Sequence, residues 1–205
     1  MRHRTHSTGA FRRARLLVAA VAGFMLLFCA TSASALDGYA DRKGVFAGIG
    51  FGGGMGAANV NDDNVSNGFE GGRLLGPAFQ GIVGGGIDDN ILGGAQLNYW
   101  FHNAQRGSQA FSHNHGNLLA VGDFFLFDSL YIEGGGGLAY TSYQGEQGDQ
   151  FEEYREMGLA LRAGVGFEHF LNGTHAVGFN AGYTRHFYSQ SNFDTLGGGF
   201  SIRWY

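Results

Sequence analysis

The chain has 205 residues, of which 38 are glycine, one is proline and one is cysteine. A single cysteine excludes an intramolecular disulfide framework. The 13 basic and 17 acidic residues give a formal charge of −4, which argues against a nucleic-acid partner, because phosphate binding needs a basic surface.

The first 35 residues have the three parts of a secretory leader. Five arginines precede an apolar stretch of 13 residues (16–28), which is too short to span a bilayer comfortably, and Ala33-Ser34-Ala35 then supplies the small residues of a cleavage site. We predict cleavage after residue 35; a retained anchor is the alternative. Residues 36–205 keep 8 basic and 17 acidic residues, a net charge of −9, and contain no cysteine.

Eight runs of alternating apolar and small or polar residues fill the rest of the chain. Strict alternation predicts a strand with one apolar face. The clearest run places Leu97 and Tyr99 on one face and Gln96 and Asn98 on the other. The eight predicted strands span residues 45–56, 78–87, 91–100, 117–127, 130–141, 154–168, 175–187 and 193–205.

The connections between these strands are predicted to alternate between short and long. We expect short turns at 88–90, 128–129 and 172–173. We expect long loops at 57–76, 101–116 and 142–153, with a shorter one at 188–192. Pro77 is expected to open the second strand, where its missing N–H costs no ladder bond. An even strand count puts both chain ends on the short-turn, periplasmic side.

The two faces of the predicted strands indicate a membrane barrel. The face opposite the apolar one is rich in glycine and poor in charge, which suits a narrow lumen better than a water-exposed surface. In lipid every backbone polar group must be paired within the protein, so the sheet must close. We therefore predict an all-β fold, an eight-stranded antiparallel up-and-down transmembrane β-barrel formed by residues 36–205 as a single domain. A soluble, lipocalin-like barrel is the alternative.

The leader, the alternating runs and the C-terminal sequence GGGFSIRWY resemble the small eight-stranded outer-membrane β-barrels, the OmpA-, OmpX- and OmpW-like group. The resemblance implies a location in the bacterial outer membrane, in contact with its lipid and lipopolysaccharide. It also implies an assembly signal for the barrel-assembly machinery, formed by Phe200, Ile202, Trp204 and Tyr205. Trp204 is in phase with the lipid face, whereas Tyr205 is one residue out of phase.

Charged residues at lumen positions predict an ion-pair network inside the barrel. Its predicted members are Asp123, Glu133, Glu156, Arg162, Glu168 and Arg203. We favour a packed plug over a pore lining, because an eight-stranded barrel has an interior just wide enough for side chains. The glycines on the lumen face of the first strand remove side chains, however, and make a ligand-sized void near that wall a further expectation.

Three histidines, His102, His113 and His115, fall in or beside the predicted loop 101–116. Such a group could bind a transition metal. On an exposed loop we expect them to be solvated instead, so we predict no metal site and no cofactor.

Late histidines and serines raise an enzymatic alternative, since lipid A deacylases are barrels with a His-x-Ser pair. Here His186 and Ser189 are three residues apart, and His169 and His175 have no such partner. Odd spacing on a strand puts two side chains on opposite faces, which argues against a nucleophile and its base.

Two arginines are predicted to face lipid at the outer ends of their strands, Arg155 and Arg185. A charge there can reach the interface, and a guanidinium can bind lipopolysaccharide phosphates.

The sequence thus predicts a non-enzymatic outer-membrane barrel with a structural role or with passage or binding of a small ligand. A lipid A-modifying hydrolase and a surface adhesin acting through the outer loops are the alternatives. The sequence selects no oligomeric state.

Overall fold

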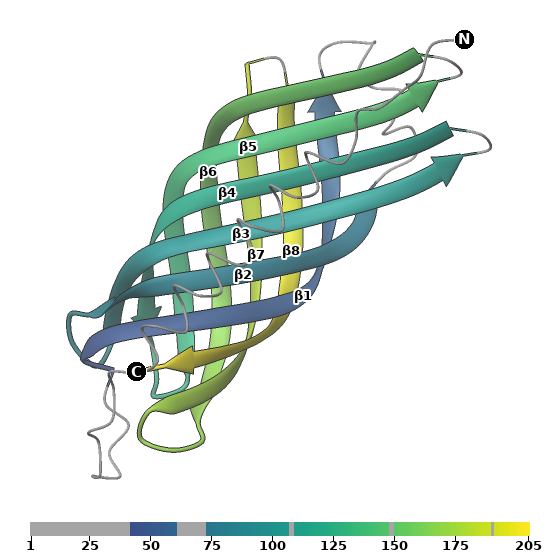
Figure 1. The fold of residues 1–205 in the computed structure, drawn as a ribbon. Coiled ribbons are helices and arrows are strands. Elements are labelled where there is room, and N and C mark those ends of the chain that lie inside the picture. Colours follow the sequence, from purple (N-terminus) through teal and green to yellow (C-terminus); the bar gives the residue numbers. More distant parts are fainter. Residues whose placement is uncertain (1–41, 61–72, 107–108, 148–149, 190) are drawn as a thin grey trace, which may run out of the picture. The chain divides into compact units, whose positions relative to one another are not determined.

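The computed structural model describes residues 42–60, 73–106, 109–147, 150–189 and 191–205, so the predicted leader over 1–35 lies outside the described residues. Eight antiparallel strands form a closed barrel in which each strand pairs with the next and β8 pairs with β1 (Figure 1). The strands are β1 (Gly44–Val60), β2 (Leu74–Gly86), β3 (Ile91–Arg106), β4 (Gln109–Phe125), β5 (Leu130–Gln147), β6 (Gln150–Phe170), β7 (His175–Phe187) and β8 (Ser191–Trp204). The predicted fold class and strand count are confirmed.

The outer wall of the barrel is apolar, as the alternation predicts. Val45 and Phe200 are 70% and 73% exposed on this wall, while Phe46 and Ser201, their neighbours in sequence, are buried. Exposed large apolar side chains occur on all eight strands. A surface of this kind is unfavourable in water and favourable in a bilayer. In the part of the chain that the structure describes, no helix is long and apolar enough to cross a membrane.

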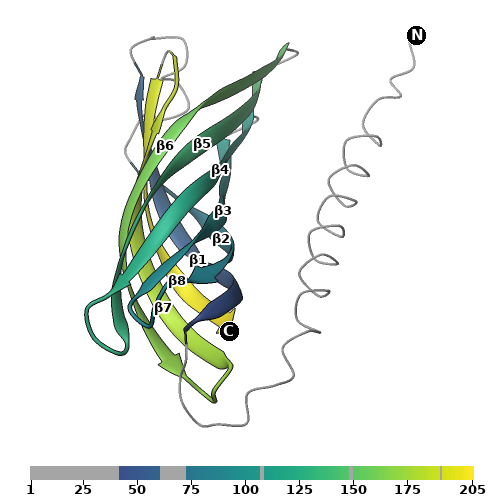
Figure 2. The same ribbon diagram turned by 90° about the vertical axis from the view of Figure 1, so that its left-hand side faces the viewer.

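In the seam between β1 and β8, lipid-facing residues of one strand pair with lipid-facing residues of the other. Phe51 pairs with Phe200, Ile49 with Ile202, and then Gly52 with Gly199. Figure 2, turned by 90°, shows these two strands side by side in the wall. A Cβ on Gly52 would lie 2.1 Å from the carbonyl oxygen of Gly198, so only glycine allows the two backbones to approach this closely.

Two of the predicted long loops are wrong. β3 and β4 stay paired to Arg106 and Gln109, and β5 and β6 stay paired to Gln147 and Gln150, so most of 101–116 and 142–153 is strand. The β2–β3 ladder already ends at the pair Ala78–Trp100, and the β6–β7 ladder ends at Leu159–Phe187.

These registers leave four strands projecting beyond their neighbours. Figure 1 shows the β3–β4 and β5–β6 hairpins leaning together away from the outer ends of β7 and β8. We call the projecting part, residues 101–106, 109–116, 142–147 and 150–158, the outer sheet. Alternation did not predict it, because outward-facing side chains beyond the bilayer meet water and need not be apolar.

The short turns occur where they were predicted, and their side chains explain them. Asp88 Oδ1 accepts the backbone N–H groups of Asn90 and Ile91, at 2.8 Å each, and Asn172 Oδ1 accepts those of Thr174 and His175. Pro77 does not open β2, which begins at Leu74. It instead precedes the first residue of the β2–β3 ladder, Ala78.

Candidate functional site: the lumen of the barrel

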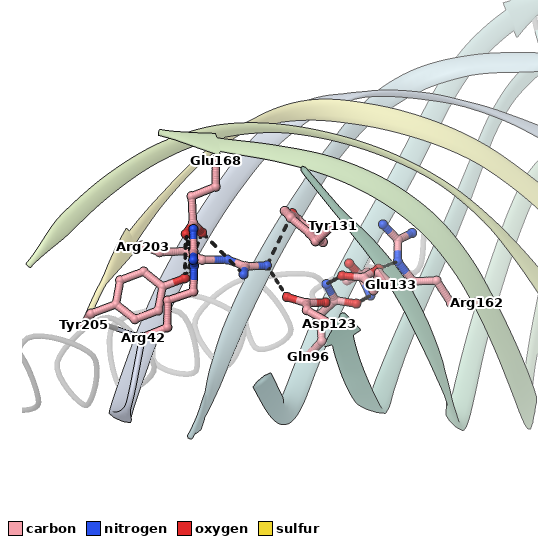
Figure 3. A network of polar contacts seen from close by, with 10 residues as sticks. Arg42, Gln96, Asp123, Tyr131, Glu133, Arg162, Glu168, Arg203 and Tyr205 are labelled. Atoms are coloured by element: carbon pink, nitrogen blue, oxygen red, sulfur yellow. Dashed lines mark hydrogen bonds and ion pairs between the residues drawn. The ribbon is translucent and has the colours of Figure 1, made fainter. Parts of the chain in front are cut away.

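The half of the lumen beside the three short turns is filled by buried ion pairs. Arg203 of β8 lies 2.7 Å from Asp123 of β4 (Nη2 to Oδ2) and 3.5 Å from Glu168 of β6 (Nη1 to Oε2), and all three side chains are at most 3% exposed (Figure 3). The guanidinium also lies over the ring of Tyr131, 4.9 Å from its centroid.

A second cluster adjoins the first. Arg162 Nε of β6 donates to Glu133 of β5, and Gln96 Nε2 of β3 donates to the other oxygen of the same carboxylate at 3.0 Å. Arg162 Nη1 donates to the hydroxyl of Thr184 at 3.2 Å. Figure 3 shows both clusters.

A third arginine, Arg42, also joins these clusters. Sequence reasoning missed it. Arg42 precedes β1, is 5% exposed, and donates from Nε to Glu168 at 3.2 Å. Its other nitrogens donate to the carbonyl oxygens of Asp89 and Asp128 in two of the short turns, and its guanidinium lies 3.8 Å from the ring centroid of Phe125. Because Arg42 lies outside any alternating run, strand periodicity could not place it.

Glu156 is separate from these ion pairs, contrary to the predicted network. Its carboxylate accepts the backbone N–H of Ser189 at 2.6 Å and the hydroxyls of Ser189 and Tyr154, near the outer end of β6. Alternation gives the face of a side chain but not which neighbours share its depth. Without Glu156 and with Arg42, three arginines face three carboxylates, so the set is formally neutral. We call it the charged plug: Arg42, Asp123, Glu133, Arg162, Glu168 and Arg203.

The C-terminal residue belongs to the lumen and not to the lipid face. The Tyr205 hydroxyl donates to both oxygens of Glu168, at 2.9 and 2.8 Å, and its ring stacks on Phe46 at 5.7 Å between centroids. The out-of-phase position of Tyr205 in the predicted assembly signal therefore has a structural reason. Phe200, Ile202 and Trp204 follow the phase of the outer wall.

Towards the outer end, the lumen is crossed by packed rings. We call them the aromatic layer: Trp100, His115, His186, Tyr188 and Phe193. His115 stacks on Phe193 at 3.6 Å between centroids, and it lies 5.6 Å from Trp100 and 5.8 Å from His186. All five side chains are at most 9% exposed.

The expected solvated histidine loop is therefore wrong. His113 and His115 are 2% and 5% exposed on β4, and His102 is the β3 residue paired with His113. Among the described residues, no group of three or more His, Cys, Asp or Glu side chains is arranged to hold a metal ion.

The two residues of the enzymatic alternative have other partners. His186 Nδ1 lies 3.0 Å from the carbonyl oxygen of Phe193, and its Nε2 lies 3.2 Å from the side-chain nitrogen of Asn117. The Ser189 hydroxyl donates to Glu156. Both imidazole nitrogens are thus engaged away from Ser189, and a base must hydrogen-bond its nucleophile to activate it.

A cavity of about 70 Å³ lies in the lumen and is lined by members of both the charged plug and the aromatic layer. We call it the lumen chamber. One wall is formed by lumen-facing glycines of β1, among them Gly50, Gly52 and Gly54, which confirms the expected void beside that strand. The opposite side is polar and includes Asn98, Asn117, Arg162, Asn180, Thr184 and His186.

The two arginines predicted to contact lipopolysaccharide are each beside a carboxylate. Arg155 pairs with Glu153 and is largely exposed, while Arg185 Nε lies 3.9 Å from Asp194 Oδ1. The guanidinium of Arg185 also lies over the ring of Phe187, 5.6 Å from its centroid. Their contact with lipopolysaccharide stays a prediction.

No protein-family model matches the sequence, and no curated protein is significantly similar to it. Solved structures do match. Ail, the attachment invasion locus protein of Yersinia pestis, superposes with a TM-score of 0.53 at 13% identity, covering 76% of this chain and 97% of that chain. Ail in complex with the heparin analogue sucrose octasulfate gives 0.54 at 14% identity, with 77% and 98% covered. Neisserial surface protein A gives 0.50 at 14% identity, with 79% and 99% covered.

Identities this low carry the fold and nothing finer. The closed eight-stranded topology and the exposed apolar wall agree with these superpositions. The chain has the fold of the small eight-stranded outer-membrane β-barrels.

Proposed function

We propose that this chain is a non-enzymatic, structural protein of the bacterial outer membrane whose lumen is closed to passing solutes. The observation that carries this proposal is the charged plug. Its six side chains come from the segment before β1 and from β4, β5, β6 and β8, so they join strands on different sides of the lumen. An interior only wide enough for side chains leaves no continuous water path when it is occupied in this way.

The formal neutrality of the charged plug supports a structural role. A pore that selects ions uses a ring of one charge, exposed to the passing solute. Here each arginine is beside a carboxylate, and Arg203, Asp123 and Glu168 are almost fully buried. Breaking such pairs is costly because a charge is left without its partner.

Planar-bilayer recording tests this proposal. We expect the purified barrel to give no channel steps. The double variant Glu133→Ala, Arg162→Ala removes one matched ion pair from the charged plug and should give small steps. It serves as the control that the assay detects an open lumen. Channel steps from the parent protein would contradict the closed lumen. Mass spectrometry tests the hydrolase alternative. Lipid A from cells that express the protein should carry the same acyl chains as lipid A from cells without it; a lost acyl chain would instead support the hydrolase alternative.

A role at the cell surface is the second candidate, and the outer sheet favours it. The pairing of β3 to β6 extends a rigid hydrogen-bonded surface beyond the ends of the β2–β3 and β6–β7 ladders. A sulfated ligand such as the heparin analogue bound to Ail needs a basic surface, whereas residues 36–205 carry a net charge of −9. We therefore do not extend that ligand to this chain.

Shortening the outer sheet tests the surface role. In this variant Asn-Gly turns join His102 to His113 and Gln144 to Glu153. It should keep the heat-modifiable gel mobility of a folded barrel, because the membrane-spanning ladders are unchanged. If the outer sheet is an adhesive surface, adherence of expressing cells to an epithelial monolayer should fall to the level of cells without the protein. Equal adherence of the parent and the shortened barrel would exclude the adhesin candidate.

A further inference from the structure

The lumen chamber contains a buried amide without a partner. Asn180 of β7 is 8% exposed and lines the chamber. Its register neighbours on β6 and β8 are Gly166 and Gly199, which offer no side chain on either side. Within the described residues, its side-chain amide makes no hydrogen bond. The amide lines the open space of the chamber, so a group bound there can hydrogen-bond to it without displacing a protein partner.

The same chamber is faced by a guanidinium with donors to spare. Arginine has five N–H donors. Arg162 uses Nε for Glu133 and Nη1 for Thr184, and its Nη2 has no acceptor among the described residues. Gly182 leaves room for this end of the side chain, because a Cβ there would lie 2.6 Å from Nη2.

Three other polar side chains of the chamber, Asn98, Asn117 and His186, are linked by hydrogen bonds. Asn98 Nδ2 donates to Asn117 Oδ1 at 2.8 Å and to Gln96 Oε1 at 3.1 Å, and Asn117 Nδ2 contacts His186 Nε2. This chain of contacts holds one side of the chamber in place. Arg162 is the single charged residue among those that line the chamber.

From these features we propose that the lumen chamber is a binding site for a small carboxylate or a similar oxyanion. The ligand accepts hydrogen bonds from Arg162 Nη2 and Asn180 Nδ2, which are otherwise unused, and the glycine wall of β1 and β8 leaves the space that it occupies. Charge-assisted hydrogen bonds from a guanidinium to an oxyanion are among the stronger polar contacts. The volume of about 70 Å³ limits the ligand to a few heavy atoms.

This proposal does not depend on the structural role proposed above, because a ligand-binding chamber need not form a continuous water path. An empty chamber would leave the conductance result unchanged, and a conducting barrel could still bind an anion. The two proposals therefore fail separately.

Titration of the ¹⁵N-labelled barrel in detergent micelles tests the site. The probe is sodium acetate, replacing sodium chloride at constant ionic strength and pH, with acetamide as the neutral compound of the same shape. We expect acetate to give saturable NMR shifts at the Asn180 side chain and at the backbone amides of Gly182 and Thr184. Acetamide should bind at least about tenfold more weakly, a difference of about 1.4 kcal/mol, because charge-assisted hydrogen bonds are stronger than neutral ones.

Matched variants distinguish acetate binding in the chamber from a general effect of the net charge of the protein. Asn180→Asp places a like charge in the chamber and should weaken acetate binding at least about tenfold. Asn103→Asp makes the same change at an exposed position of β3 and should bind acetate like the parent. Asn180→Leu, which removes the amide without adding charge, serves if the aspartate variant does not fold. Absence of saturable shifts, equal binding of acetamide, or unchanged binding in a folded Asn180 variant would each overturn the proposal.

Discussion

Replacing Arg203 by alanine is expected to destabilise the barrel more than any other single substitution in the charged plug. Arg203 is the partner of both Asp123 and Glu168, and its side chain is 3% exposed. Its removal leaves Asp123 without its cation and places three carboxylates against two arginines. Loss of one partner of a fully buried ion pair costs about 3–5 kcal/mol. We expect a loss of this size in the free energy of unfolding, measured by urea titration of the barrel in lipid vesicles.

Two further variants show whether charge imbalance causes this loss. Arg155→Ala removes an arginine whose pair with Glu153 is largely exposed, so it should change stability by less than about 1 kcal/mol. The double variant Arg203→Met, Asp123→Asn restores a neutral plug of two arginines and two carboxylates, and should recover more than half of the loss. An Arg203→Ala barrel as stable as the parent would mean that Asp123 and Glu168 find other partners or water.

The strands and their faces could be predicted from the sequence, because lipid imposes one requirement on every second residue. Phe51 opposite Phe200 and Ile49 opposite Ile202 agree with that requirement, which fixes the face of each residue but not the register. The void beside the first strand could be predicted for a related reason, since glycines such as Gly50 and Gly52 place no side chain in the lumen.

The outer sheet and the composition of the charged plug could not be predicted in this way. Beyond the bilayer the outward face meets water, so the strand segments that carry His102 and His113 lack apolar alternation, and the pattern there predicts a loop where the structure has strands. Glu156 shares the lumen face with Glu133, but strand direction places it near the opposite end of the barrel, where it binds Ser189 and Tyr154 instead of an arginine. Arg42 lies before any strand, and only the closed barrel brings it to Glu168.

Deleting Trp204 and Tyr205 is expected to impair assembly of the barrel in the membrane. Trp204 ends β8 and pairs with Ala47 of β1 and His175 of β7. The deletion therefore shortens the β1–β8 ladder, which closes the barrel, and the β7–β8 ladder. Backbone groups left unpaired at the edge of a membrane sheet have no water to bind. Tyr205 adds two further contacts, because its N–H donates to the Thr174 carbonyl oxygen at 2.9 Å and its hydroxyl donates to Glu168.

The measurement is the heat-modifiable, folded fraction of the barrel in isolated outer membranes. Deleting Gly107 and Ser108, which connect β3 and β4 in the sequence, removes the same number of residues and should leave this fraction near that of the parent. Tyr205→Phe keeps the terminal ring and loses only the hydrogen bonds to Glu168, so it should assemble normally and lose about 1–3 kcal/mol of stability. If the truncated barrel folds as well as the parent, closure does not depend on Trp204 or Tyr205. The resemblance of the last strand to an assembly signal read by the barrel-assembly machinery would then be accidental.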